Sequence, residues 1–270
     1  METPTNDFSA AYGGPAGNSA NSHRLLTILD WDDTILPTKD IARHGGKVTL
    51  SQRYVSVAAT VIELLLSLSS DNGLIILSSS TEGWVRQSCN NFFPELRPLI
   101  ERAQIVHTPK ETRQLGLKQK CPTIVKLGND FCRNVASGAG NAVETQILLI
   151  GNMRGDVEPA KTLRMLYPNV SVKTCLLKEV PTTLELEREL TYLLHSLPEL
   201  LLNGDNGGVD DYSIAEAGDL ASIDQYSEVC AARRAMLKAR QGMQKQEQSS
   251  NVVGKAKAKH GYRSLVCTQA

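Results

Sequence analysis

The sequence predicts an α/β protein in which a mainly parallel, doubly wound sheet carries helices on both faces. Short and nearly continuous apolar runs, typical of strands buried on both faces, alternate with longer segments whose apolar residues recur at helical spacing. Several of these runs end in clustered polar residues, as expected where the carboxyl ends of parallel strands open into ligand-binding loops. The alternation indicates the fold class, and the polar ends indicate where a site should lie.

Five apolar runs are expected to form the strands, at 25–30, 74–80, 105–108, 145–152 and 170–177. Apolar periodicity predicts helices between them, at 51–70, 84–93, 98–104, 123–137, 158–167 and 183–201. The segment 34–50 contains a proline and two glycines and is expected to form an irregular flap. The segment 109–122 is expected to be a loop.

The two ends of the chain differ in composition from the middle. Residues 1–23 are rich in small and polar residues and lack apolar periodicity, which predicts disorder. From residue 203 the chain becomes acidic and glycine-rich and ends in a basic run, with a helix-forming stretch around 222–247. We expect one ordered domain over 24–202 and a mostly disordered tail over 203–270.

The overall composition excludes several classes of protein. The 29 basic and 29 acidic residues balance, so neither a nucleic acid nor a membrane is expected as a partner. No apolar run approaches the roughly 18 residues that indicate a membrane span. The six cysteines are scattered without metal-like spacing, and the first residues do not have the pattern of a secretory signal. We therefore expect a cytoplasmic protein with reduced thiols.

Three carboxylates, Asp30, Asp32 and Asp33, follow the first apolar run in the stretch LLTILDWDDT. On an extended segment Asp30 and Asp32 project to the same side, so one carboxylate can attack while the other transfers protons. Like charges at the end of a buried strand call for a cation, and Mg²⁺ suits oxygen ligands. The alternative is an acidic turn in which Asp32 or Asp33 caps a helix.

This stretch resembles the first motif of the haloacid dehalogenase (HAD) superfamily, an apolar strand followed by Asp-x-Asp-x-Thr. The resemblance implies a Rossmann-like HAD fold, with Asp30 as the nucleophile and Asp32 as the general acid/base. The run ending at Ser78 is similar to the second motif, whose hydroxyl binds a phosphoryl oxygen. For the lysine of the third motif, Lys126 is the best match, and Lys120 and Lys110 remain alternatives.

The segment ILLIGNMRGD resembles the fourth HAD motif, Gly-Asp-x-x-x-Asp. The resemblance implies that Mg²⁺ is bound by Asp30, by the carbonyl group of Asp32 and by a loop containing Asn152 and Asp156. Asn152 stands where the motif has its first aspartate. An amide oxygen can bind Mg²⁺ but brings no charge, so metal affinity should fall if Asn152 is a direct ligand.

In order and spacing, these segments resemble a capless, magnesium-dependent HAD phosphatase that forms an aspartyl-phosphate. The closest resemblance is to uncharacterised HAD-like proteins of unicellular eukaryotes that share a DWDDT motif and a Glu-Gly-Trp segment, here residues 82–84. Trp31 and Ser79 are candidate substrate contacts, although Trp31 and Trp84 could instead pack against the sheet.

The connections between the motifs leave no room for a cap domain. By analogy with capless members, this implies an open site and a macromolecular substrate such as a phosphoprotein. The alternative is a catalytically weak or inactive HAD-like binding or scaffold protein, in which Asn152 marks a decayed metal site.

Overall fold

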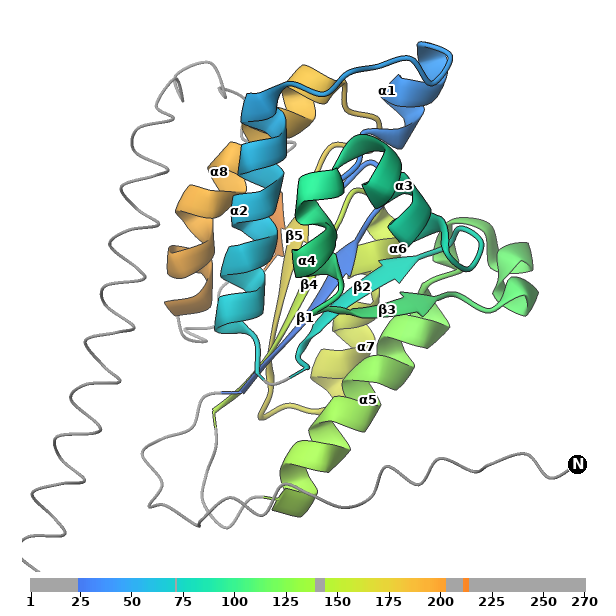
Figure 1. Cartoon of the computed structure of the whole chain (residues 1–270). Coiled ribbons are helices and arrows are strands. Elements are labelled where there is room, and N and C mark those ends of the chain that lie inside the picture. Colours follow the sequence, from blue (N-terminus) through green and yellow to red (C-terminus); the bar gives the residue numbers. More distant parts are fainter. Residues whose placement is uncertain (1–23, 71, 139–143, 203–210, 214–270) are drawn as a thin grey trace, which may run out of the picture.

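The computed structural model describes residues 24–70, 72–138, 144–202 and 211–213, and a six-stranded parallel sheet forms its centre (Figure 1). The strands are β1 (Arg24–Asp30), β2 (Leu74–Ser78), β3 (Gln104–His107), β4 (Thr145–Gly151), β5 (Ser171–Leu176) and β6 (Asp211–Ser213). Their order is β3-β2-β1-β4-β5-β6, and each described pair of neighbours is parallel.

The strand order reverses beside β1. From β1 the chain adds β2 and β3 on one side, then crosses back to place β4 and β5 on the other. The switch point therefore lies between β1 and β4, whose carboxyl ends are Asp30 and Gly151. In open α/β sheets this is where ligands bind. The doubly wound parallel fold predicted from the sequence is confirmed.

The helices connect the strands and form the outer layers. They are α1 (Thr38–Arg43), α2 (Gln52–Leu68), α3 (Trp84–Phe92), α4 (Arg97–Ile100), α5 (Cys121–Gly138), α6 (Arg154–Val157), α7 (Pro159–Leu166) and α8 (Thr183–Leu202), with the 3₁₀ helices η1 (Pro94–Leu96) and η2 (Lys110–Lys118). None of the helices described is long and apolar enough to cross a membrane.

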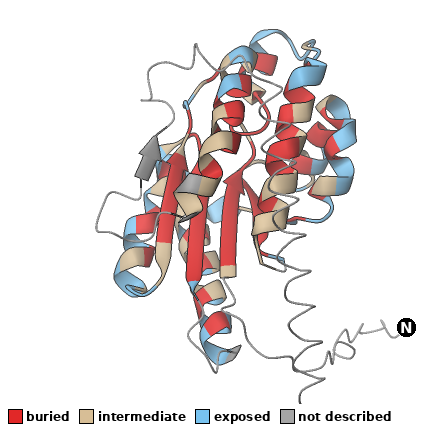
Figure 2. Ribbon diagram, turned by 90° about the vertical axis from the view of Figure 1, so that its left-hand side faces the viewer, coloured by how far each residue is buried: buried red, intermediate tan, exposed pale blue. Residues whose placement is uncertain are grey.

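Two apolar cores hold the layers together, one on each face of the sheet. On one face, alternate strand residues such as Leu29 and Leu148 pack against α2, α3 and α8. On the other face, the intervening residues, such as Ile28 and Ile147, pack against α5 and α7. Because both faces are covered, the central strands are buried along almost their whole length (Figure 2). This explains why the strands are continuous apolar runs in the sequence.

The structure contains several short elements that the sequence-based expectation did not include. The expected flap contains the helix α1, and the expected loop contains η2, which is kinked at Gly116 where φ is +56°. The segment predicted to be a mostly disordered tail contains β6, a strand too short to give a periodic signal. The predictions for 1–23, for the rest of 203–270 and for a helix around 222–247 lie outside the described residues.

Candidate active site

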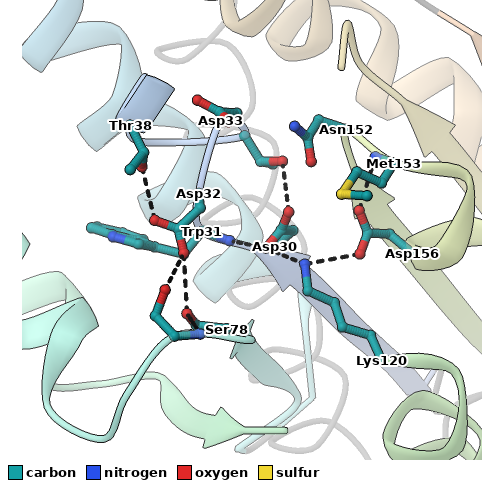
Figure 3. A network of polar contacts seen from close by, with 12 residues as sticks. Asp30, Trp31, Asp32, Asp33, Thr38, Ser78, Lys120, Asn152, Met153 and Asp156 are labelled. Carbon is teal, nitrogen blue, oxygen red and sulfur yellow. Dashed lines mark hydrogen bonds and ion pairs between the residues drawn. The ribbon is translucent and has the colours of Figure 1, made fainter. Parts of the chain in front are cut away.

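Side chains from all four sequence motifs meet at the carboxyl ends of β1, β2 and β4 (Figure 3). Asp30 ends β1 and Ser78 ends β2, and Asp156 lies on α6 shortly after β4. Lys120 is the residue just before α5, and its side chain reaches the same place. The sheet thus gathers two carboxylates, a hydroxyl group and an ammonium group from distant parts of the sequence.

The Asp30 carboxylate lies at the centre of this cluster and is 4% exposed. Its Oδ1 accepts a hydrogen bond from the Trp31 backbone N–H at 2.7 Å and pairs with Lys120 Nζ at 2.6 Å. Its Oδ2 accepts a longer bond of 3.3 Å from the Thr34 hydroxyl. Burial raises the pKa of Asp30 to about 7, Lys120 opposes this rise and Asp156 adds to it. Because this pKa already includes the effect of Lys120, a further cation is needed for Asp30 to be fully ionised near neutral pH.

Lys120 is the cation of the site. Its Nζ lies 2.6 Å from Asp30 Oδ1 and 2.9 Å from Asp156 Oδ1. Burial by itself would lower the pKa of this ammonium group, but the two carboxylates raise it above its ordinary value. Lys120 therefore stays charged between them.

The position of Lys120 corrects the assignment made from the sequence. Lys126 was expected to supply the cation, but its side chain is exposed on α5. The helix begins at Cys121, so Lys126 lies more than one turn along it, about 7.5 Å along the helix axis from its first residue at 1.5 Å per residue. Lys120, one of the two alternatives, immediately precedes the helix and reaches the edge.

Gly151 and Gly155, on either side of the loop that leads to Asp156, each make a close contact that a side chain would block. A Cβ atom on Gly151 would lie 2.4 Å from Asp156 Cβ, so only glycine lets this aspartate pack against the end of β4. A Cβ atom on Gly155 would lie 1.8 Å from the carbonyl oxygen of Leu117. The end of η2 thus packs directly on α6, and this contact holds the segment that carries Lys120.

Asn152 has a buried acceptor without a hydrogen-bond partner among the described residues. Its side chain is 4% exposed, and its Nδ2 donates to the Glu179 carbonyl oxygen at 2.8 Å. Because a carbonyl can only accept, this bond fixes the orientation of the amide, and Oδ1 faces the other way. In Figure 3 that oxygen points toward the cluster, where it makes no hydrogen bond. A buried unsatisfied acceptor is costly, so a bound cation would stabilise it.

The residues at this position fit a magnesium ion in their chemistry. Asp30, Asn152 and Asp156 offer hard oxygen donors, and the first and last also pair with Lys120. Among the described residues, no group of three or more His, Cys, Asp or Glu side chains is arranged to hold a metal. Asn152 is an amide and does not count toward such a group.

The Asp32 carboxylate accepts four hydrogen bonds and is half-buried. Its Oδ1 accepts from Thr38 Oγ1 and Trp84 Nε1, both at 2.8 Å, and its Oδ2 accepts from Ser78 Oγ at 3.2 Å and Ser80 Oγ at 3.1 Å. The strand ends at Asp30, so the two-residue alternation expected from the sequence no longer applies. Asp32 consequently engages residues beside β2, whereas Asp30 engages Lys120 (Figure 3).

Of the two roles considered for Trp31 from the sequence, substrate contact and packing, the structure supports packing. Trp31, a candidate substrate contact, is fully buried; its Nε1 donates to Ser88 Oγ at 2.9 Å and its ring meets Phe93 edge to face. It packs in the core and is not available to a substrate. Trp84 contacts Asp32 instead, and the Glu-Gly-Trp segment was the signal that marked it. Ser79 is half-buried, and its two neighbours, Ser78 and Ser80, are the serines that donate hydrogen bonds to Asp32.

Asp33 and Lys39 shape the turn after β1. Asp33 has a φ of +55°, unusual for a residue with a side chain, and its Oδ1 accepts from the Lys39 backbone N–H at 2.8 Å. Lys39 Nζ lies 3.4 Å from Asp33 Oδ2 and donates to the Glu179 carbonyl oxygen at 3.3 Å. Burial raises the pKa of Asp33, and the contacts with Lys39 oppose this rise. Sequence reasoning did not identify Lys39 because an exposed lysine gives no local signal.

Chemically, the arrangement combines a buried carboxylate held by an ammonium group with a second carboxylate held by neutral donors. The first suits nucleophilic attack and the second suits proton transfer. Comparison with protein-family models, with curated proteins and with solved structures gives no significant match.

Proposed function

We propose that this chain is a HAD-like phosphohydrolase that uses Mg²⁺ and forms an aspartyl-phosphate on Asp30. The observation that supports this most is the Lys120 ammonium group, which bridges Asp30 and Asp156 at the switch point of the sheet. A fixed cation beside a buried carboxylate favours the ionised nucleophile and offsets the charge of an incoming phosphoryl group.

In the first half-reaction, an Asp30 carboxylate oxygen attacks phosphorus and forms a P–O bond. The bond from phosphorus to the leaving oxygen breaks, and its electron pair stays on that oxygen. Asp32 gives the leaving oxygen a proton, so an alcohol or phenol departs. Ser78 and Lys120 hold phosphoryl oxygens during this step.

In the second half-reaction, water attacks the phosphorus of the aspartyl-phosphate. Asp32, now ionised, takes a proton from the water as the new P–O bond forms. The bond between phosphorus and Asp30 breaks, which releases inorganic phosphate and restores the Asp30 carboxylate. Each aspartate thus returns to its initial state.

Asp30, Asp156 and the Oδ1 atom of Asn152 would hold Mg²⁺, with the carbonyl group of Asp32 as a further proposed ligand. When bound, the ion would neutralise charge on the phosphoryl group. The Asn152 Oδ1 atom supports this assignment, because it has no hydrogen-bond partner among the described residues and is directed at the cluster.

A phosphorylated protein is the proposed substrate class, and the cytoplasm the proposed location. The support is the absence of room for a cap in the motif spacing, together with the analogy to capless members of the family. With equal numbers of basic and acidic residues, the chain offers no general attraction for nucleic acids or membranes.

Release of phosphate from para-nitrophenyl phosphate tests the proposal. The wild type should turn over only with Mg²⁺, and Asp30→Asn should reduce turnover to background because an amide is not a nucleophile. Asp130→Asn is the matched control, since it makes the same chemical change at an exposed position on α5. Full activity in Asp30→Asn would exclude the mechanism.

A non-catalytic binding or scaffold protein is the second candidate. Two observations favour it: Asn152 replaces a carboxylate, and the described residues contain no three-acid metal cluster. A wild type as inert as Asp30→Asn, with and without Mg²⁺, would support this alternative.

A further inference from the structure

One face of α3 contacts the turn after β1 at two points. Trp84 Nε1 donates to Asp32 Oδ1 at 2.8 Å, and Ser88 Oγ accepts from Trp31 Nε1 at 2.9 Å. Trp84 and Ser88 are four residues apart, so they lie one turn apart on the same face of the helix. The helix therefore holds two consecutive residues of the turn, the core tryptophan and the second aspartate.

The backbone before α3 is shaped to begin the helix at Trp84. Gly83 precedes the helix with a φ of +86°, a conformation that glycine adopts at little cost. The Trp84 backbone N–H donates to the Thr81 carbonyl oxygen at 3.0 Å, and the indole packs partly against the core beneath α3. The position of the Trp84 ring is thus set by both the backbone and the core.

Trp84 differs in kind from the other three donors to Asp32. The hydroxyl groups of Thr38, Ser78 and Ser80 can rotate and can either donate or accept. An indole N–H can only donate, in a direction fixed by the ring. Asp32 Oδ1 must therefore remain an acceptor, and Oδ2, which faces two hydroxyl groups, is the oxygen able to carry a proton.

We propose that Trp84 is the positioning residue for Asp32, and that it directs the transfer of the proton on Oδ2 to the leaving oxygen. This inference rests on the proposed phosphohydrolase function. As the bond from phosphorus to the leaving oxygen breaks, the O–H bond on Asp32 Oδ2 breaks and a new O–H bond forms on the leaving oxygen. Trp84 itself does not touch the substrate in this step.

The role of Trp84 in turnover can be tested by comparing kcat for substrates with different leaving groups. An alkyl phosphate needs its leaving oxygen protonated, whereas para-nitrophenolate departs without help. Trp84→Phe keeps an aromatic ring and removes the N–H. It should lower kcat for an alkyl phosphate such as phosphoserine by about ten- to a hundredfold, part of what general acid catalysis supplies. For para-nitrophenyl phosphate the loss should be within about threefold, with KM unchanged for both.

Ser88→Ala is the matched control, because it removes the other contact between α3 and the turn without touching Asp32. It should leave the ratio of the two kcat values at the wild-type level. An equal loss on both substrates in Trp84→Phe, or a changed ratio in Ser88→Ala, would show that α3 acts only as packing and would overturn the proposal.

A spectroscopic measurement tests the contact without any turnover. The chain contains two tryptophans, so its NMR spectrum has two indole N–H resonances, and Trp84→Phe assigns them. Asp32→Asn should shift the Trp84 resonance upfield and leave that of Trp31 nearly unchanged, while Ser88→Ala should do the reverse. If Asp32→Asn left the chemical shift of the Trp84 indole N–H unchanged, the proposal would be overturned. A wild type with this NMR coupling but no phosphatase activity would exclude the proposed function, and with it the role of Trp84 in proton transfer.

Discussion

A single ammonium group decides the charge balance at the centre of the site. Lys120 lies between two buried carboxylates, and no hydrogen bond or ion pair joins Asp30 to Asp156 directly among the described contacts. Removing one partner of a buried ion pair leaves uncompensated charge in a poorly solvated place. The two candidate lysines can therefore be distinguished by stability as well as by activity.

Lys120→Met should lower the free energy of unfolding by about 3–5 kcal/mol at pH 8 in EDTA, the usual cost of breaking a buried pair. Lys126→Met is the matched control and should stay within about 0.5 kcal/mol of the wild type, because its side chain is exposed. Urea denaturation of both variants measures the difference. Equal stabilities would show that the pairs with Asp30 and Asp156 do not form in solution.

The site residues at strand ends were predictable from the sequence. The lysine of the site was not, because its position depends on where α5 begins. Asp30 and Ser78 were identified because each ends a buried apolar run, and for Ser78 the choice rested on the resemblance to the second HAD motif. Lys120 was ranked below Lys126 because sequence does not fix a helix start to within a turn, and one turn moves a lysine from the site to solvent. For Trp31 and Trp84, tertiary packing alone decides which ring is buried.

At the scale of elements, the strands and long helices were predictable because each carries a periodic apolar pattern. Short elements were missed: α1, η2 and β6 are too brief or too polar to show a period. Their positions depend on contacts with distant segments. Asp40 of α1, for example, accepts hydrogen bonds from the backbone N–H and the hydroxyl group of Thr183 at the start of α8.

We expect the contact between η2 and α6 to fix the position of Lys120, which follows η2 in the chain. Gly155→Ala would place a Cβ atom 1.8 Å from the Leu117 carbonyl oxygen, and backbone cannot rotate away as a side chain can. We expect a loss of about 1–3 kcal/mol in unfolding free energy, the usual cost of overpacking, with a loss of phosphatase activity.

Gly128→Ala on α5 is the control for Gly155→Ala. Its Cβ would lie 2.6 Å from Leu163 Cδ2, the end of a side chain that can turn, and alanine favours a helix over glycine by roughly 0.5–1 kcal/mol. Thermal or urea unfolding should therefore find Gly128→Ala close to wild type. Similar costs for both variants would mean that the approach of η2 to α6 is looser than this structure describes.

At the scale of the whole molecule, binding of a metal at the proposed site would be linked to folding stability. A ligand that binds only the folded state raises the free energy of unfolding by an amount that grows with its concentration, reaching about 2.7 kcal/mol at a hundred times Kd. The proposed donors come from β1, from the end of β4 and from α6, segments that only folding brings together. Stability measured against Mg²⁺ concentration therefore reports on the site even in the absence of turnover.

Asn152→Asp should lower the free energy of unfolding without metal and increase the stabilisation that Mg²⁺ provides. In EDTA the variant should be less stable than wild type, because it adds a buried negative charge and replaces the donor that faces the Glu179 carbonyl with an acceptor. With Mg²⁺ it should gain more stability than wild type, because a carboxylate binds the ion more tightly than an amide. Asp156→Asn, which removes a proposed ligand, should respond least to the metal. Denaturation midpoints across a Mg²⁺ titration measure all three proteins, and parallel, flat curves would show that these residues do not form a magnesium site.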